Sequence, residues 1–327
     1  MMREIAASGS KGNPIATTPE TLAAPVSRWR RLQSVRIRRP DWATLVFLAP
    51  LLLIFGVFSW LPIVRSIVMS VQETNLFTEP VFVGLDNFAR VVADPLFGKA
   101  VANTAYFGIL ALVFGYPVPL VLAVLMSELR RTKGLLAALA YLPVVMPPVV
   151  AVLLWKVFFD ASPTGLFNTL LDTVGLGPLP WLQSAATVMP SLVLQATWAA
   201  AGGTVLIYLA ALVSVPAELY DAADTDGASI LQKVRHITLP HLRPVLLVTF
   251  VLQIIGTSQL FLEPFLFTGG GPANATTTVL LLIYKYAFQN SVGGDYGAAT
   301  ALSLMLAAFL AVISALYFRL TRSWSQA

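Results

Sequence analysis

The side chains that could carry out covalent or metal chemistry are few in this sequence. Cysteine is absent, and the two histidines, His236 and His241, are five residues apart with Pro240 between them. On an α-helix this spacing would point the imidazoles about 140° apart, so they would not share a metal ion. The sequence contains no GxxxxGK[ST] loop, no GxSxG nucleophile and no HExxH zinc motif. These residues predict a chain that is not an enzyme and holds no metal or cofactor of its own.

One carboxylate, Glu263, follows a long apolar run and precedes Pro264. An acid at membrane depth is a candidate proton relay. Glu263 has no charged partner at helical spacing, which favours a place at the outer membrane interface. A stand-alone carrier coupled to ions or protons remains the alternative function, and it would require paired charges within the membrane.

Composition decides the class of protein. Of the 327 residues, 57% are hydrophobic and 11% are charged, against about 25% charged in soluble domains. This excludes a soluble globular enzyme, a disordered chain and a fibrous repeat. Residues 1–40 hold 8 of the 21 lysines and arginines, so the basic balance belongs to this segment and does not indicate nucleic-acid binding. We expect 1–40 to be a disordered cytoplasmic tail that touches anionic membrane lipid.

Six apolar runs without Asp, Glu, Lys or Arg follow the tail. The first has 23 residues and would extend about 34 Å as a helix, enough for a hydrocarbon core of about 30 Å. The fourth is too long for one crossing, and its Gly-Pro-rich part (175–180) predicts a loop, so its helix should start near Ala185. The runs are Trp42–Val64, Ala100–Ser127, Gly134–Trp155, Thr173–Ala217, Pro244–Leu262 and Tyr296–Phe318. The sequence therefore predicts an all-α polytopic membrane domain over 41–322 with six transmembrane helices, followed by a cytoplasmic end at 323–327.

The distribution of basic residues predicts the orientation. With the N-terminus inside, 16 lysines and arginines fall on the inner side and 5 on the outer side. The positive-inside rule then places both termini in the cytoplasm. The connections 128–134 and 215–243 would face the cytoplasm as well.

The connection 215–243 has the pattern of a short helix, a turn and a second helical piece. Pro216 suits a first helical turn. Leu219, Ala222 and Ala223 fall at i, i+3 and i+4 and form one small apolar face. Gly227 suits a left-handed stop, and Pro240 should end the second piece. Small side chains on such a surface would let a partner protein approach closely.

These residues resemble a known family. Asp221-Ala222-Ala223, Gly227 and Ile237-Thr238-Leu239-Pro240 resemble the EAA motif of binding-protein-dependent ABC importer permeases, with Asp221 where the motif has glutamate. The resemblance implies the type I ABC importer permease fold and a loop that couples to an ATPase subunit dimer, which binds ATP and Mg. It assigns the coupling to Asp221, Ala222, Ala223, Gly227, Leu239 and Pro240.

Two further segments narrow the resemblance. Phe82-Val-Gly-Leu-Asp-Asn-Phe88, and Thr268-Gly-Gly-Gly-Pro272 with Thr276 and Tyr284, resemble the MalF-type subunit of the carbohydrate importers. This implies a permease subunit of an ATP-driven importer for a di- or oligosaccharide in the bacterial cytoplasmic (inner) membrane. The implied partners are a second, MalG-type permease, the ATPase and an extracytoplasmic sugar-binding protein.

A path for sugars needs uncharged hydrogen-bonding groups and aromatic faces at membrane depth. Gln253 and Thr257 share one helix face, and by resemblance they fall where the maltose permease has sugar-contacting residues. Any of these polar groups could instead make an interhelical hydrogen bond worth about 0.6 kcal/mol. The expected pathway residues are Gln195, Thr197 and Trp198 in the fourth span and Gln253, Thr257 and Ser258 in the fifth.

Overall fold

The structure, a computed structural model, describes residues 42–75, 77–129, 132–289 and 293–322. The expected basic tail (1–40) and the expected cytoplasmic end (323–327) lie outside these residues. The described chain is helical apart from one antiparallel ribbon, in which β1 (Gln72–Glu73) pairs with β2 (Val81–Phe82). It separates into two compact units, Met1–Ser59 and Trp60–Ala327.

The described part of the first unit is helical and apolar. Helix α1 (Trp42–Phe55) continues into the π-helix η2 (Gly56–Trp60), and α2 (Leu61–Ser70) follows in the second unit. The run Thr44–Ser70 is long and apolar enough to cross a membrane, and its large side chains are mostly exposed, as expected of a surface that lipid or another subunit covers.

The second unit contains four more uninterrupted candidate spans. The first combines α4 (Pro95–Leu110), the π-helix η3 (Ala111–Gly115) and α5 (Pro117–Glu128). The others are α9 (Val188–Val213), the run Ile230–Ser258 and α15 (Tyr296–Arg322). The run Ile230–Ser258 consists of α11 (Ile230–Lys233), the π-helix η4 (Val234–Thr238) and α12 (Leu239–Ser258). The shorter helices are α3 (Asp86–Ala93), α8 (Leu166–Asp172), α10 (Ala217–Thr225), α13 (Leu262–Thr268) and α14 (Val279–Phe288).

The span predicted over Gly134–Trp155 is broken. Helices α6 (Lys133–Val145) and α7 (Pro148–Phe158) are bent by 99° relative to each other. Met146 and Pro147 have ψ of 137° and 130°, outside the helical region. The consecutive prolines explain the break, because each lacks an N–H and disfavours helical geometry in the residue before it. The predicted six spans are therefore present when this bent pair is counted as one.

Pro240 does not end a helix, and that part of the prediction is wrong. It lies in the first turn of α12, which continues directly from η4. In a regular α-helix the proline ring would collide with the carbonyl four residues earlier. The π-helix widens the backbone in the turn that precedes Pro240, so the helix passes through it. The fifth span accordingly begins at Ile230 rather than at Pro244.

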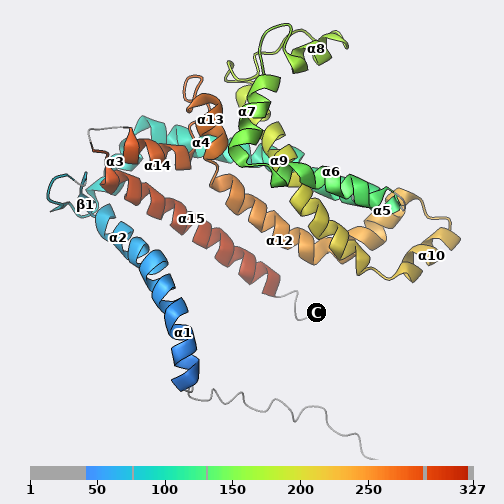
Figure 1. Ribbon diagram of the computed structural model, residues 1–327, viewed down its shortest axis with the longest axis horizontal. Coiled ribbons are helices and arrows are strands. Elements are labelled where there is room, and N and C mark those ends of the chain that lie inside the picture. Colours follow the sequence, from blue (N-terminus) through green and yellow to red (C-terminus); the bar gives the residue numbers. More distant parts are fainter. Residues whose placement is uncertain (1–41, 76, 130–131, 290–292, 323–327) are drawn as a thin grey trace, which may run out of the picture. The chain divides into compact units, whose positions relative to one another are not determined.

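Helix α9 lies at the centre of the second unit and packs against α5, α6 and α12 (Figure 1). Tyr208 and Val205 are fully buried in the cluster that α9 forms with Ala123 of α5. At Gly202 a Cβ atom would lie 2.0 Å from the backbone oxygen of Ala140 in α6. Glycine is required there because the two backbones are in direct contact.

The loop between α13 and α14 is fastened to α4. Asn103 Nδ2 donates to the backbone oxygens of Asn274 (2.8 Å) and Thr277 (2.9 Å). Thr104 Oγ1 accepts from the Val279 N–H at 3.0 Å. The Gly-Pro-rich segment after the fifth span is thereby held against the start of the second span.

Candidate functional site

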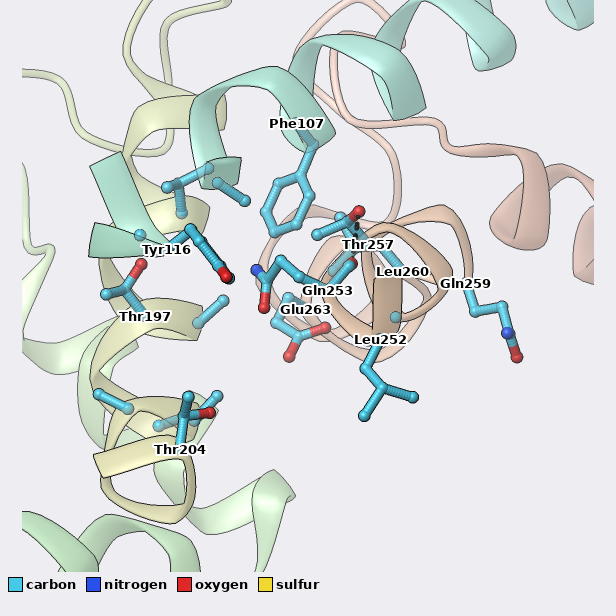
Figure 2. A pocket seen from close by; sticks show the side chains of 18 of the residues that line it. Phe107, Tyr116, Thr197, Thr204, Leu252, Gln253, Thr257, Gln259, Leu260 and Glu263 are labelled. Carbon is cyan, nitrogen blue, oxygen red and sulfur yellow. Dashed lines mark hydrogen bonds between the residues drawn. The ribbon is translucent and has the colours of Figure 1, made fainter. Parts of the chain in front are cut away.

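A cavity of about 630 Å³ lies between α9 on one side and α12 with α13 on the other, with α4, η3 and α5 closing it (Figure 2). Ligand sites in proteins commonly measure about 300–1,000 Å³. Figure 2 shows Phe107, Tyr116 and Gln253 pointing into a common space. The volume suits a small saccharide.

Three of the six predicted pathway residues line this cavity. They are Thr197 of α9 and Gln253 and Thr257 of α12. Thr257 Oγ1 donates to the backbone oxygen of Gln253 at 2.9 Å, which leaves its lone pairs as acceptors. No hydrogen bond of the Gln253 amide is recorded in the described part of the chain, so this amide is available as both donor and acceptor.

The other three predicted pathway residues lie behind the wall. Gln195 is 1% exposed, and its Oε1 has no hydrogen-bond partner among the described residues. Trp198 packs on Trp155 with ring centroids 5.4 Å apart. Ser258 Oγ donates to the backbone oxygen of Ile254 at 2.8 Å. The structure therefore does not bring these three side chains into the cavity with the first three.

Close packing shapes one wall of the cavity. A Cβ atom on Gly115 would lie 2.7 Å from Thr197 Oγ1. The absence of a side chain at 115 lets η3 approach α9 and leaves the Thr197 hydroxyl at the cavity surface. Next to it, Tyr116 OH donates to the backbone oxygen of Leu246 at 2.6 Å and lies 3.2 Å from Thr249 Oγ1. Tyr208 OH lies 2.8 Å from the same Thr249 hydroxyl, so a hydrogen-bond chain crosses from α5 through α12 to α9.

Sequence reasoning missed several lining residues, among them Phe107, Tyr116 and Thr204. The position of Tyr116 could have been noticed in the sequence, because Gly115 and Pro117 on either side of it mark an irregular point in a charge-free run. Phe107 and Thr204 carried none, because an apolar span places residues of these types on any face.

Glu263 also lines the cavity, which Figure 2 shows from close by. Sequence reasoning placed Glu263 at the outer membrane interface and did not include it among the residues of the sugar pathway. Helix α13 follows α12 after a break at Gln259–Phe261 and packs against α7 and α9, which brings Glu263 to the cavity. Burial raises the pKa of the Glu263 carboxyl above its ordinary value of 4.5.

The predicted coupling residues gather around α10. Pro216 is the N-cap residue, and Gly227 has φ of 71°, the predicted left-handed conformation. Asp221, Ala222 and Gly227 are exposed. Ala223 is half-buried, so the surface available to a partner is formed chiefly by the first three.

Two side-chain contacts fix α10 against the start of the fifth span. Lys233 Nζ lies 2.6 Å from Asp224 Oδ1, and Tyr220 OH lies 3.0 Å from Thr238 Oγ1. Ser229 caps α11 and accepts from the Gln232 N–H. Leu239 and Pro240 lie apart from α10, in the first turn of α12 beyond α11 and η4.

Comparison with known proteins agrees with this architecture. Residues 115–326 match the family of the binding-protein-dependent transport system inner membrane component. The arabinooligosaccharides transport system permease protein AraP of Halalkalibacterium halodurans is 36% identical over 83% of this chain and 86% of that protein. The trehalose/maltose transport system permease protein MalF of Thermococcus litoralis is 30% identical over 85% of this chain and 92% of that protein.

A solved structure shares the fold. In the crystal structure of a bacterial alginate ABC transporter in complex with an alginate pentasaccharide-bound periplasmic protein, one chain superposes with a TM-score of 0.76. That chain is 26% identical, and the match covers 88% of this chain and 96% of that one. The predicted type I ABC importer permease fold is thereby confirmed. This chain belongs to the family of inner membrane components of binding-protein-dependent transport systems.

Proposed function

We propose that this chain is the permease subunit of an ATP-driven importer for an oligosaccharide and forms half of its translocation pathway. The cavity carries the proposal. It presents hydroxyl and amide groups from Tyr116, Thr197, Gln253 and Thr257 beside the aromatic ring of Phe107. Hydroxyl-rich ligands need such groups for hydrogen bonding and such rings for packing against their C–H faces. The names of the arabinooligosaccharide and trehalose/maltose relatives support the same substrate class.

In this proposal the sugar binds between two walls. Gln253 and Thr257 of α12 bind hydroxyls from one side, while Thr197 and Tyr116 face them from the other. The proposal gives a supporting role, without sugar contact, to the residues behind the wall, Gln195, Trp198 and Ser258. Trp198 packs against the aromatic cluster that contains Trp155, and the Ser258 hydroxyl is hydrogen-bonded to its own helix.

The proposed complex contains three kinds of protein partner, besides the sugar substrate and membrane lipid. A second, MalG-type permease completes the pathway, and an extracytoplasmic sugar-binding protein delivers the substrate. An ATPase dimer binds ATP and Mg in the cytoplasm, so this chain needs no cofactor. Membership in a binding-protein-dependent family supports the binding protein, and the exposed α10 surface supports the ATPase.

The proposed coupling runs through α10. Asp221, Ala222 and Gly227 insert into a cleft of the ATPase subunit, and closure of the ATPase dimer on ATP moves α10. Because α10 is fixed by side-chain contacts to the continuous run of α11, η4 and α12, the movement reaches Gln253 and Thr257 and changes the side from which the cavity is open. The binding protein and ATP supply the bias through their different affinities for the two states.

The test is reconstitution. The chain is purified from its host membrane with its co-purifying subunits, placed in proteoliposomes, and assayed with di- to pentasaccharides of arabinose, glucose and galactose. We expect ATP-dependent uptake of at least one sugar that requires the binding protein. Uptake that follows an ion or proton gradient without ATP would instead support the stand-alone carrier. Such a carrier does not fit the family to which the chain belongs.

A further inference from the structure

One charged side chain stands among the described residues that line the cavity. It is Glu263, and the other polar lining groups are hydroxyls, amides and backbone atoms. A single carboxylate dominates the local potential of such a cavity, because charges interact more strongly near protein walls than in bulk water.

The structure records no ion pair and no hydrogen bond to another side chain for this carboxylate in the described part of the chain. Its own backbone N–H is the group that favours its charged form. Two lysines on elements that pack near α13 are engaged elsewhere. Lys156 Nζ of α7 donates to the backbone oxygen of Leu266 at 3.3 Å, and Lys285 Nζ of α14 lies 3.2 Å from Thr277 Oγ1. The acceptor capacity of Glu263 is therefore available to a ligand.

The chemistry of this group separates two kinds of saccharide. A carboxylate accepts hydrogen bonds from hydroxyls and has no proton to donate when ionised. It complements the donor that the Gln253 amide supplies to the same cavity. A uronate or phosphate on the ligand would bring a like charge into the same cavity, and like-charge juxtaposition costs several kcal/mol.

We propose that Glu263 sets the charge specificity of the translocation cavity, admitting neutral oligosaccharides and excluding acidic ones. The inference rests on the proposed function and goes beyond it, because the structural relative is part of a transporter that imports the acidic polysaccharide alginate. Similarity of fold alone would leave both substrate classes open. The lone carboxylate decides between them.

The experiment uses the reconstituted complex and a matched pair of ligands. The pair is the neutral sugar identified by the uptake screen and its derivative in which a terminal CH₂OH is oxidised to a carboxylate. Binding of both to the complex without the binding protein is measured by titration calorimetry, which removes selection by that protein. Glu263→Gln, which keeps the shape, should raise the acidic-to-neutral affinity ratio about tenfold, which equals about 1.4 kcal/mol. Glu79→Gln, at an exposed site outside the cavity, should leave the ratio unchanged.

A second measurement uses the unaltered protein. As pH falls from 8 to 5, protonation of Glu263, whose pKa is raised by burial, should relieve the exclusion, while an exposed uronate with an ordinary pKa near 4 stays charged. The other titratable groups near Glu263 are lysines and tyrosines, and side chains of these types in general titrate near pH 10. Burial lowers the pKa of Lys285, but this side chain contacts Thr277 instead of the cavity. The other titratable groups on the cavity wall or on elements packed around α13 are Tyr116, Lys156, Tyr208, Tyr284, Lys285 and Tyr286.

The outcomes are distinct. Failure of every neutral and acidic sugar to be taken up would overturn the proposed function itself. Uptake of an acidic sugar by the unaltered complex, or an affinity ratio that Glu263→Gln leaves unchanged, would overturn the charge-specificity proposal and leave the importer intact. Loss of a proton flux coupled to sugar uptake in Glu263→Gln would identify a proton relay instead and would also overturn it.

Discussion

Gly115 and Gly202 mark two places where other helices come closest to α9. At Gly115 a side chain would collide with Thr197 Oγ1, and at Gly202 with the backbone of α6. The first contact shapes the cavity wall and the second fixes the scaffold behind it. Glycine therefore has a different role at each position: Gly115 shapes the candidate site, and Gly202 permits the close packing of two helices.

The polar face of α12 is tested by truncation. Gln253→Ala and Thr257→Ala each remove a hydrogen-bonding group from the cavity and should weaken sugar binding by about 0.5–1.5 kcal/mol per lost bond. We expect lower uptake with normal assembly of the complex. Gln289→Ala, at an exposed position outside the cavity, is the control. Wild-type uptake in both cavity variants would remove these residues from the pathway.

The adjacent glycines of α9 provide a matched pair. Gly202→Ala places a methyl group 2.0 Å from the Ala140 oxygen, whereas Gly203→Ala meets nothing within 4 Å. Overpacking costs about 1–3 kcal/mol, while alanine favours a helix over glycine by about 1 kcal/mol. Thermal unfolding of the purified complex should show a lower Tm for Gly202→Ala and an equal or higher Tm for Gly203→Ala. Equal Tm changes would mean that α6 and α9 separate easily.

At the scale of elements, α10 is a short helix held from behind. The Lys233–Asp224 ion pair and the Tyr220–Thr238 contact fix its rotation, so that Asp221 and Ala222 remain exposed. An exposed ion pair contributes little to stability, about 0–1 kcal/mol. In the proposed coupling role its value is orientation, since a coupling element must keep one face toward its partner.

The turn after α10 is tested at Gly227. Its φ of 71° is left-handed, and valine there would add about 1–2 kcal/mol of strain. Gly227→Val should uncouple ATP hydrolysis from sugar uptake or release the ATPase, whereas Gly227→Asn, which tolerates this conformation, should retain both. ATPase co-purification and sugar-stimulated ATP hydrolysis measure the difference. Normal coupling in the valine variant would contradict the proposed role of the turn.

The carboxylate of Asp221 is tested separately. Asp221→Ala should weaken ATPase binding, by about 2–5 kcal/mol if the partner cation is buried in the interface. Asp221→Glu should bind normally, because it restores the residue that gives the EAA motif its name. The measurement is the affinity of the purified membrane subunits for the ATPase. Equal affinity of the alanine variant would show that Asp221 lies outside the contact.

At the scale of the molecule, the second unit has two functional ends. The C-terminal end of α5 and α10 lie at one end, while α13 and α14 lie toward the other (Figure 1). Glu128 at the end of α5 contributes to the electrostatic environment of Lys233, in agreement with that placement. The predicted cytoplasmic orientation would put the first end on the ATPase side.

Because the chain has no cysteine, single cysteines can test this orientation. Ser229→Cys should resist membrane-impermeant thiol reagents added to intact cells and react after permeabilisation. Val174→Cys, exposed after α8, should react in both conditions. Ready labelling at 229 in intact cells would reverse the topology and rule out α10 as the ATPase contact.

The helical runs were predictable because lipid excludes charge from a span, which leaves a pattern in the sequence. The turn at Gly227 was predictable because glycine adopts the left-handed backbone conformation without strain. The place of Glu263 was not, because it depends on the packing of α13 against α7 and α9, a tertiary contact without a local pattern. The same holds for Gln195 and Trp198, since periodicity within a long apolar helix does not say which side faces a cavity. The effect of Pro240 was missed because a π-helix has no simple signature.

The π-helix η4 also has an evolutionary consequence. Each residue turns an α-helix by about 100°, and a π-helix accommodates one extra residue in its turn. Loss of one residue from Val234–Thr238 would therefore return this turn to a regular α-helix, in which the Pro240 ring would collide with the carbonyl four residues earlier. A single insertion or deletion in the α-helical part between Leu239 and Gln253 would instead rotate everything before it, α10 included, by about a quarter turn relative to Gln253, whereas substitutions preserve this phase. Lineages that keep this importer working should therefore vary in residue identity across this segment while keeping its length constant.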